Sequence, residues 1–209
     1  MRATSLGLAL VLILPLSACG AGTPKKPLTN EWPTAAIDDG DYKDITKDWT
    51  RSAVLHGDYQ EVLELAATLK TPEWRLVHAE RDAKNRGLVG AAKEQRIAQA
   101  KADAEGPYEL ELMVTTWDQR ENDLDRGAKA AWRVTLLDGT GKEIAPLEVT
   151  KDRRQPFVVR TEFPAFGDFA KGYVVKFPRE ANVLGPGVKQ VRLRLSGERG
   201  GVEVTWDAP

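Results

Sequence analysis

The sequence predicts a mostly β fold, an antiparallel immunoglobulin-like (Ig-like) β-sandwich with an α-helical hairpin near its N-terminal side. Three observations lead to this prediction. Apolar and polar residues alternate in most segments from Tyr108 to the C-terminus, turn sequences separate these segments, and residues 72–104 carry helix signals instead. We expect residues 42–209 to form one domain, because about 170 residues is an ordinary domain size.

The composition is that of a folded globular protein. The 209 residues are 42% hydrophobic and 29% charged, and 30 Lys and Arg residues against 31 Asp and Glu residues leave a net charge of −1. Nucleic acids and anionic lipid surfaces select basic proteins. We therefore expect no nucleic acid partner.

Residues 1–18 have the order of a secretory signal peptide. Arg2 supplies a basic start, Leu6 to Leu16 form an apolar middle, and small residues follow. A bilayer-spanning helix needs about 20 apolar residues, so this stretch is too short to be a permanent span.

The end of this segment, Leu16-Ser17-Ala18-Cys19, resembles the lipobox of bacterial lipoprotein precursors. The resemblance implies that a diacylglycerol is attached to Cys19, that a type II signal peptidase cuts before it, and that the new N-terminus receives an acyl chain such as palmitate. Two or three acyl chains hold a protein firmly on a bilayer. The alternative is a secreted protein with a chance cysteine.

The resemblance also implies a location. The protein would be anchored in the cell envelope with the lipid bilayer as its partner. Gly20 stands where an aspartate would signal inner-membrane retention in Gram-negative lipoproteins, so the outer membrane is the expected address in such an organism. Because Cys19 is the sole cysteine, the chain has no intramolecular disulfide.

Residues 19–41 predict a flexible tether, since they contain three prolines, three glycines and no periodic apolar pattern. Trp32 is the exception and could fold back onto the domain. The following segment, residues 49–69, fits both a strand and one face of a helix. The interruption at His56-Gly57-Asp58 favours a β-hairpin.

Residues 72–104 predict the helical hairpin. Thr71 suits the N-cap, Pro72 suits the first turn, and Gly87 suits the residue after the first helix. A second helix is expected from Leu88 to about Ala104, with a thin apolar face that needs support from another element.

From Tyr108 onward the apolar period is two, and a series of strands joined by turns is expected. Trp132 and Trp206 alternate with Val and Leu, which marks them as core residues. The segments have the sequences YELELMVTTW, AWRVTLL, KEIAPLEV, PFVVRTEF, GYVVKF, KQVRLRL and VEVTW.

The order of several short motifs is similar to that in a group of uncharacterised bacterial lipoproteins. The motifs are W-x-R, A-T-x-x-x-P-E-W-R, W-R-V-x-L, E-F-P, Y-V-V-K-F-P and V-x-W, over about residues 49–209. This resemblance implies the same fold and carries no activity with it.

The sequence offers no catalytic constellation, so we predict no catalytic residue, no metal and no cofactor. His56 and His78 are the two histidines, too few for a zinc site at short ligand spacing. No serine stands in a G-x-S-x-G turn. The acidic segment from Glu121 to Asp125 does not match an EF-hand loop, and an irregular calcium site in this segment is the alternative.

Trp117 is the one tryptophan that is a candidate for exposure, because it stands at a strand end beside charged residues, and structural packing is the favoured alternative. With Asp118, Asp123 and Asp125 it forms the candidate ligand-binding region. The leading hypothesis is a non-catalytic, membrane-anchored lipoprotein for binding or structural work, with an envelope protein or glycan as partner. The alternatives are a carbohydrate- or peptidoglycan-binding module and, third, an envelope hydrolase with a carboxylate pair.

Overall fold

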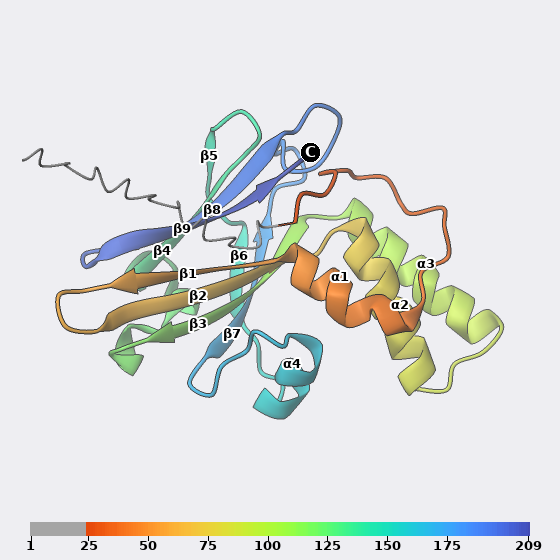
Figure 1. Cartoon of the computed structure of the whole chain (residues 1–209), viewed down its shortest axis with the longest axis horizontal. Helices are drawn as coiled ribbons and strands as arrows, with labels where there is room; N and C mark the ends of the chain where they lie inside the picture. Colours follow the sequence, from red (N-terminus) through yellow and green to blue (C-terminus); the bar gives the residue numbers. More distant parts are fainter. Residues whose placement is uncertain (1–23) are drawn as a thin grey trace, which may run out of the picture.

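The computed structural model describes residues 24–209, which form two antiparallel β-sheets around one hydrophobic core (Figure 1). The first sheet has the order β1–β2–β3–β7–β6, with β1 at Thr50–His56, β2 at Glu61–Leu69, β3 at Tyr108–Thr116, β7 at Lys171–Phe177 and β6 at Glu148–Lys151. The second has the order β5–β4–β8–β9, with β5 at Glu143–Ile144, β4 at Trp132–Leu137, β8 at Gln190–Gly197 and β9 at Gly200–Asp207.

Alternation along the strands builds the core between the sheets. On β3 the buried inner residues are Tyr108, Leu110, Leu112 and Val114, and on β8 they are Val191, Leu193 and Leu195. Trp132 and Trp206 are buried with them, as predicted. Each large apolar side chain contributes about 1.5–3 kcal/mol when buried, so this inner face accounts for much of the stability.

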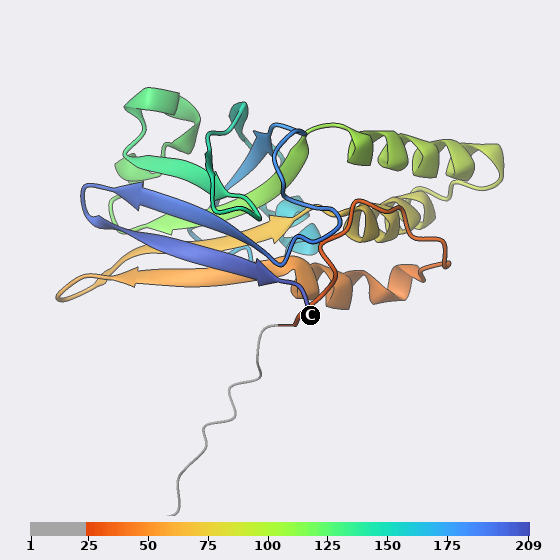
Figure 2. The ribbon, with the colours of Figure 1, turned by 90° about the horizontal axis from the view of Figure 1, so that it is seen from above.

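The α1, α2 and α3 helices gather at one end of the sheets (Figure 2). The helices are α1 at Tyr42–Trp49, α2 at Pro72–Asn85, α3 at Ala91–Glu105 and α4 at Pro156–Glu162, with short 3₁₀ turns η1 at Asp39–Asp41, η2 at Gln119–Glu121 and η3 at Leu124–Lys129. The α1, α2 and α3 helices project beyond the strands, whereas α4 lies beside β7 (Figure 1). The Thr71 side chain accepts a hydrogen bond from the Trp74 amide and caps α2, as the sequence predicts.

Several predictions of local structure are confirmed. The fold is mostly β with two antiparallel sheets, residues 50–69 form a β-hairpin, and α2 and α3 form the helical hairpin. The two sheets are not closed into a barrel, and the finer assignment of an Ig-like sandwich stays a prediction.

The strand predicted for PFVVRTEF is wrong, because residues 156–162 form α4. Pro156 occupies the first turn of that helix, where its missing amide hydrogen has no consequence. Val159 and Phe163 are buried while Phe157 is exposed, and a spacing of four residues places the two buried side chains on one helical face. The sequence KEIAPLEV forms β5 and β6, which belong to different sheets. The α1 helix was not predicted.

Residues 24–30 pack against the domain, which differs from the flexible tether predicted for 19–41. The Arg51 Nη2 atom donates to the Pro24 carbonyl at 2.8 Å, and the Gly185 amide donates to the Leu28 carbonyl at 2.8 Å. Leu28 is buried in the core, which provides an apolar reason for the docking. Cys19 and the rest of residues 1–23 lie outside the described residues.

The outer face of the first sheet, which points away from the second sheet, is divided into two halves. On β3 the residues of this face are Glu109, Glu111, Met113 and Thr115, because the intervening residues point into the core. Glu111 and Met113 are buried beneath the helical side of the molecule, and we call their surroundings the covered half. Glu64 of β2 is exposed opposite Thr115, and we call this region the open half.

Candidate functional site

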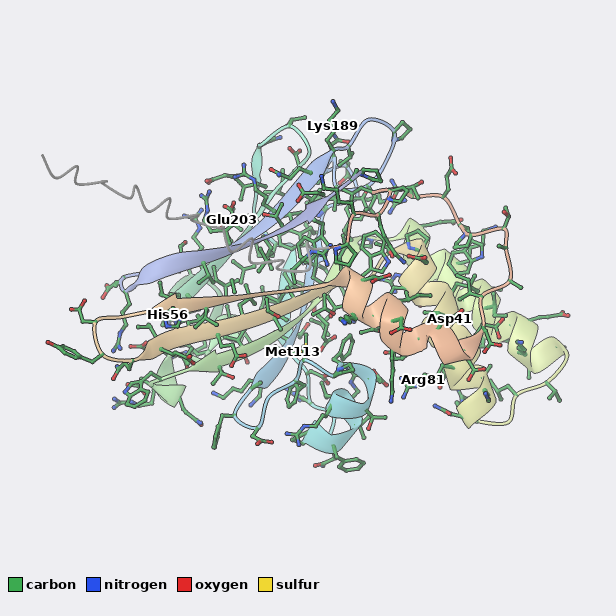
Figure 3. All side chains as sticks on the ribbon, in the orientation of Figure 1. Asp41, His56, Arg81, Met113, Lys189 and Glu203 are labelled. Carbon is green, nitrogen blue, oxygen red and sulfur yellow. The ribbon has the colours of Figure 1, made fainter. Side chains whose placement is uncertain are left out.

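The open half ends in a groove of about 510 Å³ at the tip of the β1–β2 hairpin. Figure 3 labels His56, the last residue of β1, at this end of the sheet, and Met113 nearer the middle of β3. The groove is lined by Tyr59, Gln60, Glu61, Val62, Leu63, Glu64, Thr115, Thr116, Trp117, Gln119 and Phe169. We call it the aromatic groove.

Three aromatic side chains from separate segments line this groove. Tyr59 lies in the β1–β2 turn and is 99% exposed, Trp117 follows β3 and is 65% exposed, and Phe169 precedes β7 and is 72% exposed. Trp117, the candidate for exposure, is therefore exposed and not packed into the domain. Single exposed aromatics are ordinary, but several around one groove mark a surface for interaction.

The backbone holds Trp117 and Tyr59 at the rim. The Trp117 amide donates to the Val62 carbonyl at 3.1 Å, which continues the pairing of β3 with β2 by one residue. The Gly57 amide donates to the Gln60 carbonyl at 2.8 Å and closes the turn that carries Tyr59. Both rings are thus presented by hydrogen-bonded strand ends.

The predicted acidic residues do not converge with Trp117 on a ligand site. Asp118 accepts hydrogen bonds from the Arg120 side chain and backbone, and these hold the pKa of Asp118 at about 2. Asp123 accepts the Ala131 amide at 2.9 Å and lies 3.3 Å from Arg126. Asp125 is exposed on η3. Asp118, Asp123 and Asp125 do not line the aromatic groove, and residues 24–209 contain no group of three His, Cys, Asp or Glu side chains placed to hold a metal ion.

The covered half contains a charged cluster that the sequence analysis did not identify. Glu111 is fully buried, and its carboxylate lies 2.9 Å from the Lys70 Nζ atom and 3.7 Å from the Arg154 guanidinium. Arg154 also binds Asp152 at 2.6 Å and pairs with Glu162 at the end of α4. The cluster therefore connects β3 to the segments that begin α2 and α4.

Burial raises the pKa of Glu111 to about 7, against the opposing attraction of Lys70. Burial also disfavours ionisation of Asp152, but hydrogen bonds from Arg154 outweigh it and lower the pKa of Asp152. Glu111 and Asp152 are thus a pair of neighbouring carboxyl groups, of which Asp152 ionises first and Glu111 keeps its proton to a higher pH.

Gly172 of β7 makes room for this pair. A Cβ atom at this position would lie 3.1 Å from the Asp152 Cβ atom and 3.6 Å from Glu111 Oε1. Any side chain here would press on the space in which the two carboxyl groups meet.

Aromatic rings close the covered half from outside. Trp74 of α2 and Phe163 after α4 stack with ring centroids 5.7 Å apart, and Trp74 also stacks on His78 at 4.8 Å. The Lys70 ammonium lies within 6 Å of both the Trp74 and the Phe163 ring. These contacts secure the helices to the sheet, so His78, Trp74 and Phe163 act as packing residues.

Tyr59, Phe169 and Glu111 were not predicted from the sequence. Tyr59 and Phe169 each follow a Gly-Asp pair in a turn. The same Gly-Asp-aromatic pattern at residues 40–42 places Tyr42 in the core, so the pattern alone does not predict exposure.

Comparison with protein-family models, with curated proteins and with solved structures finds no match for this chain. Within residues 24–209, none of the helices combines the length and apolar character that crossing a bilayer requires.

Proposed function

We propose that this chain is a lipoprotein of the cell envelope, anchored through acylated Cys19, whose domain is a non-catalytic binding module of the Ig-like sandwich class. The binding surface is the aromatic groove. The observation that carries this proposal is the meeting of Tyr59, Trp117 and Phe169, three exposed rings from separate segments, around one groove.

The docked N-terminal segment supports a close attachment to the membrane. Pro24 follows Cys19 by five positions, and an extended chain spans at most about 3.6 Å per residue, which gives roughly 18 Å. The domain would therefore lie near the bilayer that holds the acyl chains. In a Gram-negative cell the expected location is the outer membrane.

Intact-mass spectrometry of the membrane-extracted protein tests the anchor. The expected mass is that of residues 19–209 with two or three acyl chains, and a Cys19→Ser variant should lose both the cleavage and the lipid. A mass without lipid would contradict the anchor. In a Gram-negative host, a Gly20→Asp variant should move from the outer to the inner membrane fraction, whereas a Gly20→Ala variant should not.

A further inference from the structure

We propose that the aromatic groove binds an uncharged sugar chain on the side of the domain that faces away from the membrane. The proposal deepens the function given above, and its statement about the membrane rests on the proposed lipid anchor.

The lining of the groove has the chemistry that sugar rings require. Pyranose rings present flat C–H faces that stack on aromatic side chains, and Tyr59, Trp117 and Phe169 supply such surfaces. Sugar hydroxyl groups also need hydrogen-bond partners. The side chains of Gln60, Glu64, Thr115 and Gln119 offer donors and acceptors between the rings.

The charge of the groove selects against acidic ligands. Within the part of the chain that the structure describes, its charged lining residues are Glu61 and Glu64, and no Lys, Arg or His lines it. A phosphate, sulfate or uronic acid would meet two carboxylates without a cation to pair with. The same charge disfavours insertion of the rings among anionic lipid headgroups.

The position of the groove separates it from the anchor. Arg51 near the start of β1 holds Pro24, whereas His56 and then Tyr59 lie at the other end of the strand. Five residues of β-strand rise by about 17 Å, so the docked segment and the groove lie at opposite ends of β1. Figure 2 shows this arrangement, with the β1–β2 turn far from the first residues of the described chain.

The size of the groove is suitable for a short segment of a chain. Its volume of about 510 Å³ lies within the range of roughly 300–1,000 Å³ that small-ligand sites occupy.

Isothermal titration calorimetry tests the proposal with three uncharged probes: the tetramer of β-1,4-linked N-acetylglucosamine, cellotetraose and maltotetraose. The protein is the mature lipidated chain in a detergent without a sugar headgroup, since alkyl glycosides would compete. At least one probe should bind, and the Trp117→Ala and Phe169→Ala variants should each weaken that binding about three- to tenfold.

Phe157→Ala is the matched control. Phe157 is 71% exposed, almost the same as Phe169, but it lies on α4 and does not line the groove. This variant should bind the probe as the unaltered protein does. An acidic probe, tetragalacturonate, should bind at least tenfold more weakly than the uncharged one.

Three results would overturn the proposal. One is the absence of binding by all uncharged probes at about 10 mM. Another is binding that Trp117→Ala and Phe169→Ala leave unchanged. The third is association of the unlipidated chain of residues 20–209 with phosphatidylglycerol vesicles that these two substitutions abolish, which would assign the groove to a bilayer. None of these results affects the intact mass, so the lipid anchor is tested separately.

Discussion

The covered half and the open half of the outer face of the first sheet differ in burial, although the same strands run through both. In the covered half, helices and two stacked aromatic rings bury Glu111 and leave its charge dependent on Lys70 and Arg154. In the open half, Glu64 remains in water and three aromatic rings stay exposed. On this face, an aromatic residue therefore stabilises the fold where helices cover it, whereas it is free to bind a ligand where they do not.

The largest expected difference between the halves concerns two phenylalanines. Phe163→Ala removes a buried ring that stacks on Trp74, and it should lower the free energy of unfolding by about 3–5 kcal/mol. Phe169→Ala removes an exposed ring and should change the free energy of unfolding by less than about 0.5 kcal/mol. Urea denaturation followed by circular dichroism measures both values. Equal losses would contradict the division into two halves.

The second prediction concerns the pH dependence of stability. Because the pKa of Glu111 is about 7 in the folded protein and 4.5 in the unfolded chain, the folded state binds this proton more tightly. The contribution of Glu111 to the free energy of unfolding is therefore favourable at low pH. It decreases by an amount on the order of 3 kcal/mol as the pH rises from about 4.5 to 7.

Glu111→Gln removes this titration. The variant should resemble the unaltered protein in stability near pH 5 and should exceed it near pH 8, as measured by denaturation at both pH values. Glu64→Gln, on the open half of the same face, should leave the difference between the two pH values unchanged. If the free energy of unfolding changed equally between the two pH values in the unaltered protein and in Glu111→Gln, the buried carboxyl group would not control stability in this pH range.

The third prediction concerns the start of β1, where Arg51 holds the N-terminal segment at the end opposite the aromatic groove. Arg51 is buried and donates hydrogen bonds to the carbonyls of Pro24 and Thr205, so Arg51→Ala should cost about 2–3 kcal/mol and release residues 24–30. Trypsin cleavage after Lys25 should then become faster. Arg133→Ala, at an exposed position on β4, is the control and should alter neither quantity. Unchanged cleavage in Arg51→Ala would mean that other contacts hold the segment.

The smallest expected effect is at the N-cap of α2, the helix that carries Trp74 over the covered half. Thr71→Ala removes the hydroxyl that accepts the Trp74 amide and should lower the free energy of unfolding by about 1 kcal/mol. Thr71→Ser keeps the hydroxyl and should recover most of this loss in the same denaturation measurement. A loss as large in Thr71→Ser as in Thr71→Ala would assign the effect to the methyl group.

The inner face of the sheets could be predicted from sequence, and the outer face could not. Alternation placed Leu110 and Leu112 in the core because burial between two sheets depends on each strand's own pattern. The partner Arg154 of Glu111 comes much later in the chain, just before α4, and alternation assigned the α4 segment to a strand. The period of the apolar residues along a strand does not indicate which half of the polar face is covered by another element.

The candidate site was predicted in part for the same reason. Trp117 could be identified because its exposure follows from its place at a strand end beside charged residues. Tyr59 and Phe169 meet it only when the β1–β2 turn and the segment before β7 come together, and such long-range proximity has no local signal. The acidic residues beside Trp117 in sequence instead stabilise turns through Arg120, Arg126 and the Ala131 amide.

The most direct test of the division is an NMR titration that follows the indole N–H signals of the tryptophans while an uncharged tetrasaccharide is added to the mature protein. We expect the Trp117 signal to shift with saturation and the Trp74 signal, from the covered half, to stay in place. A shift of Trp74 with Trp117 unchanged, or no shift of either signal, would contradict the assignment of binding to the open half.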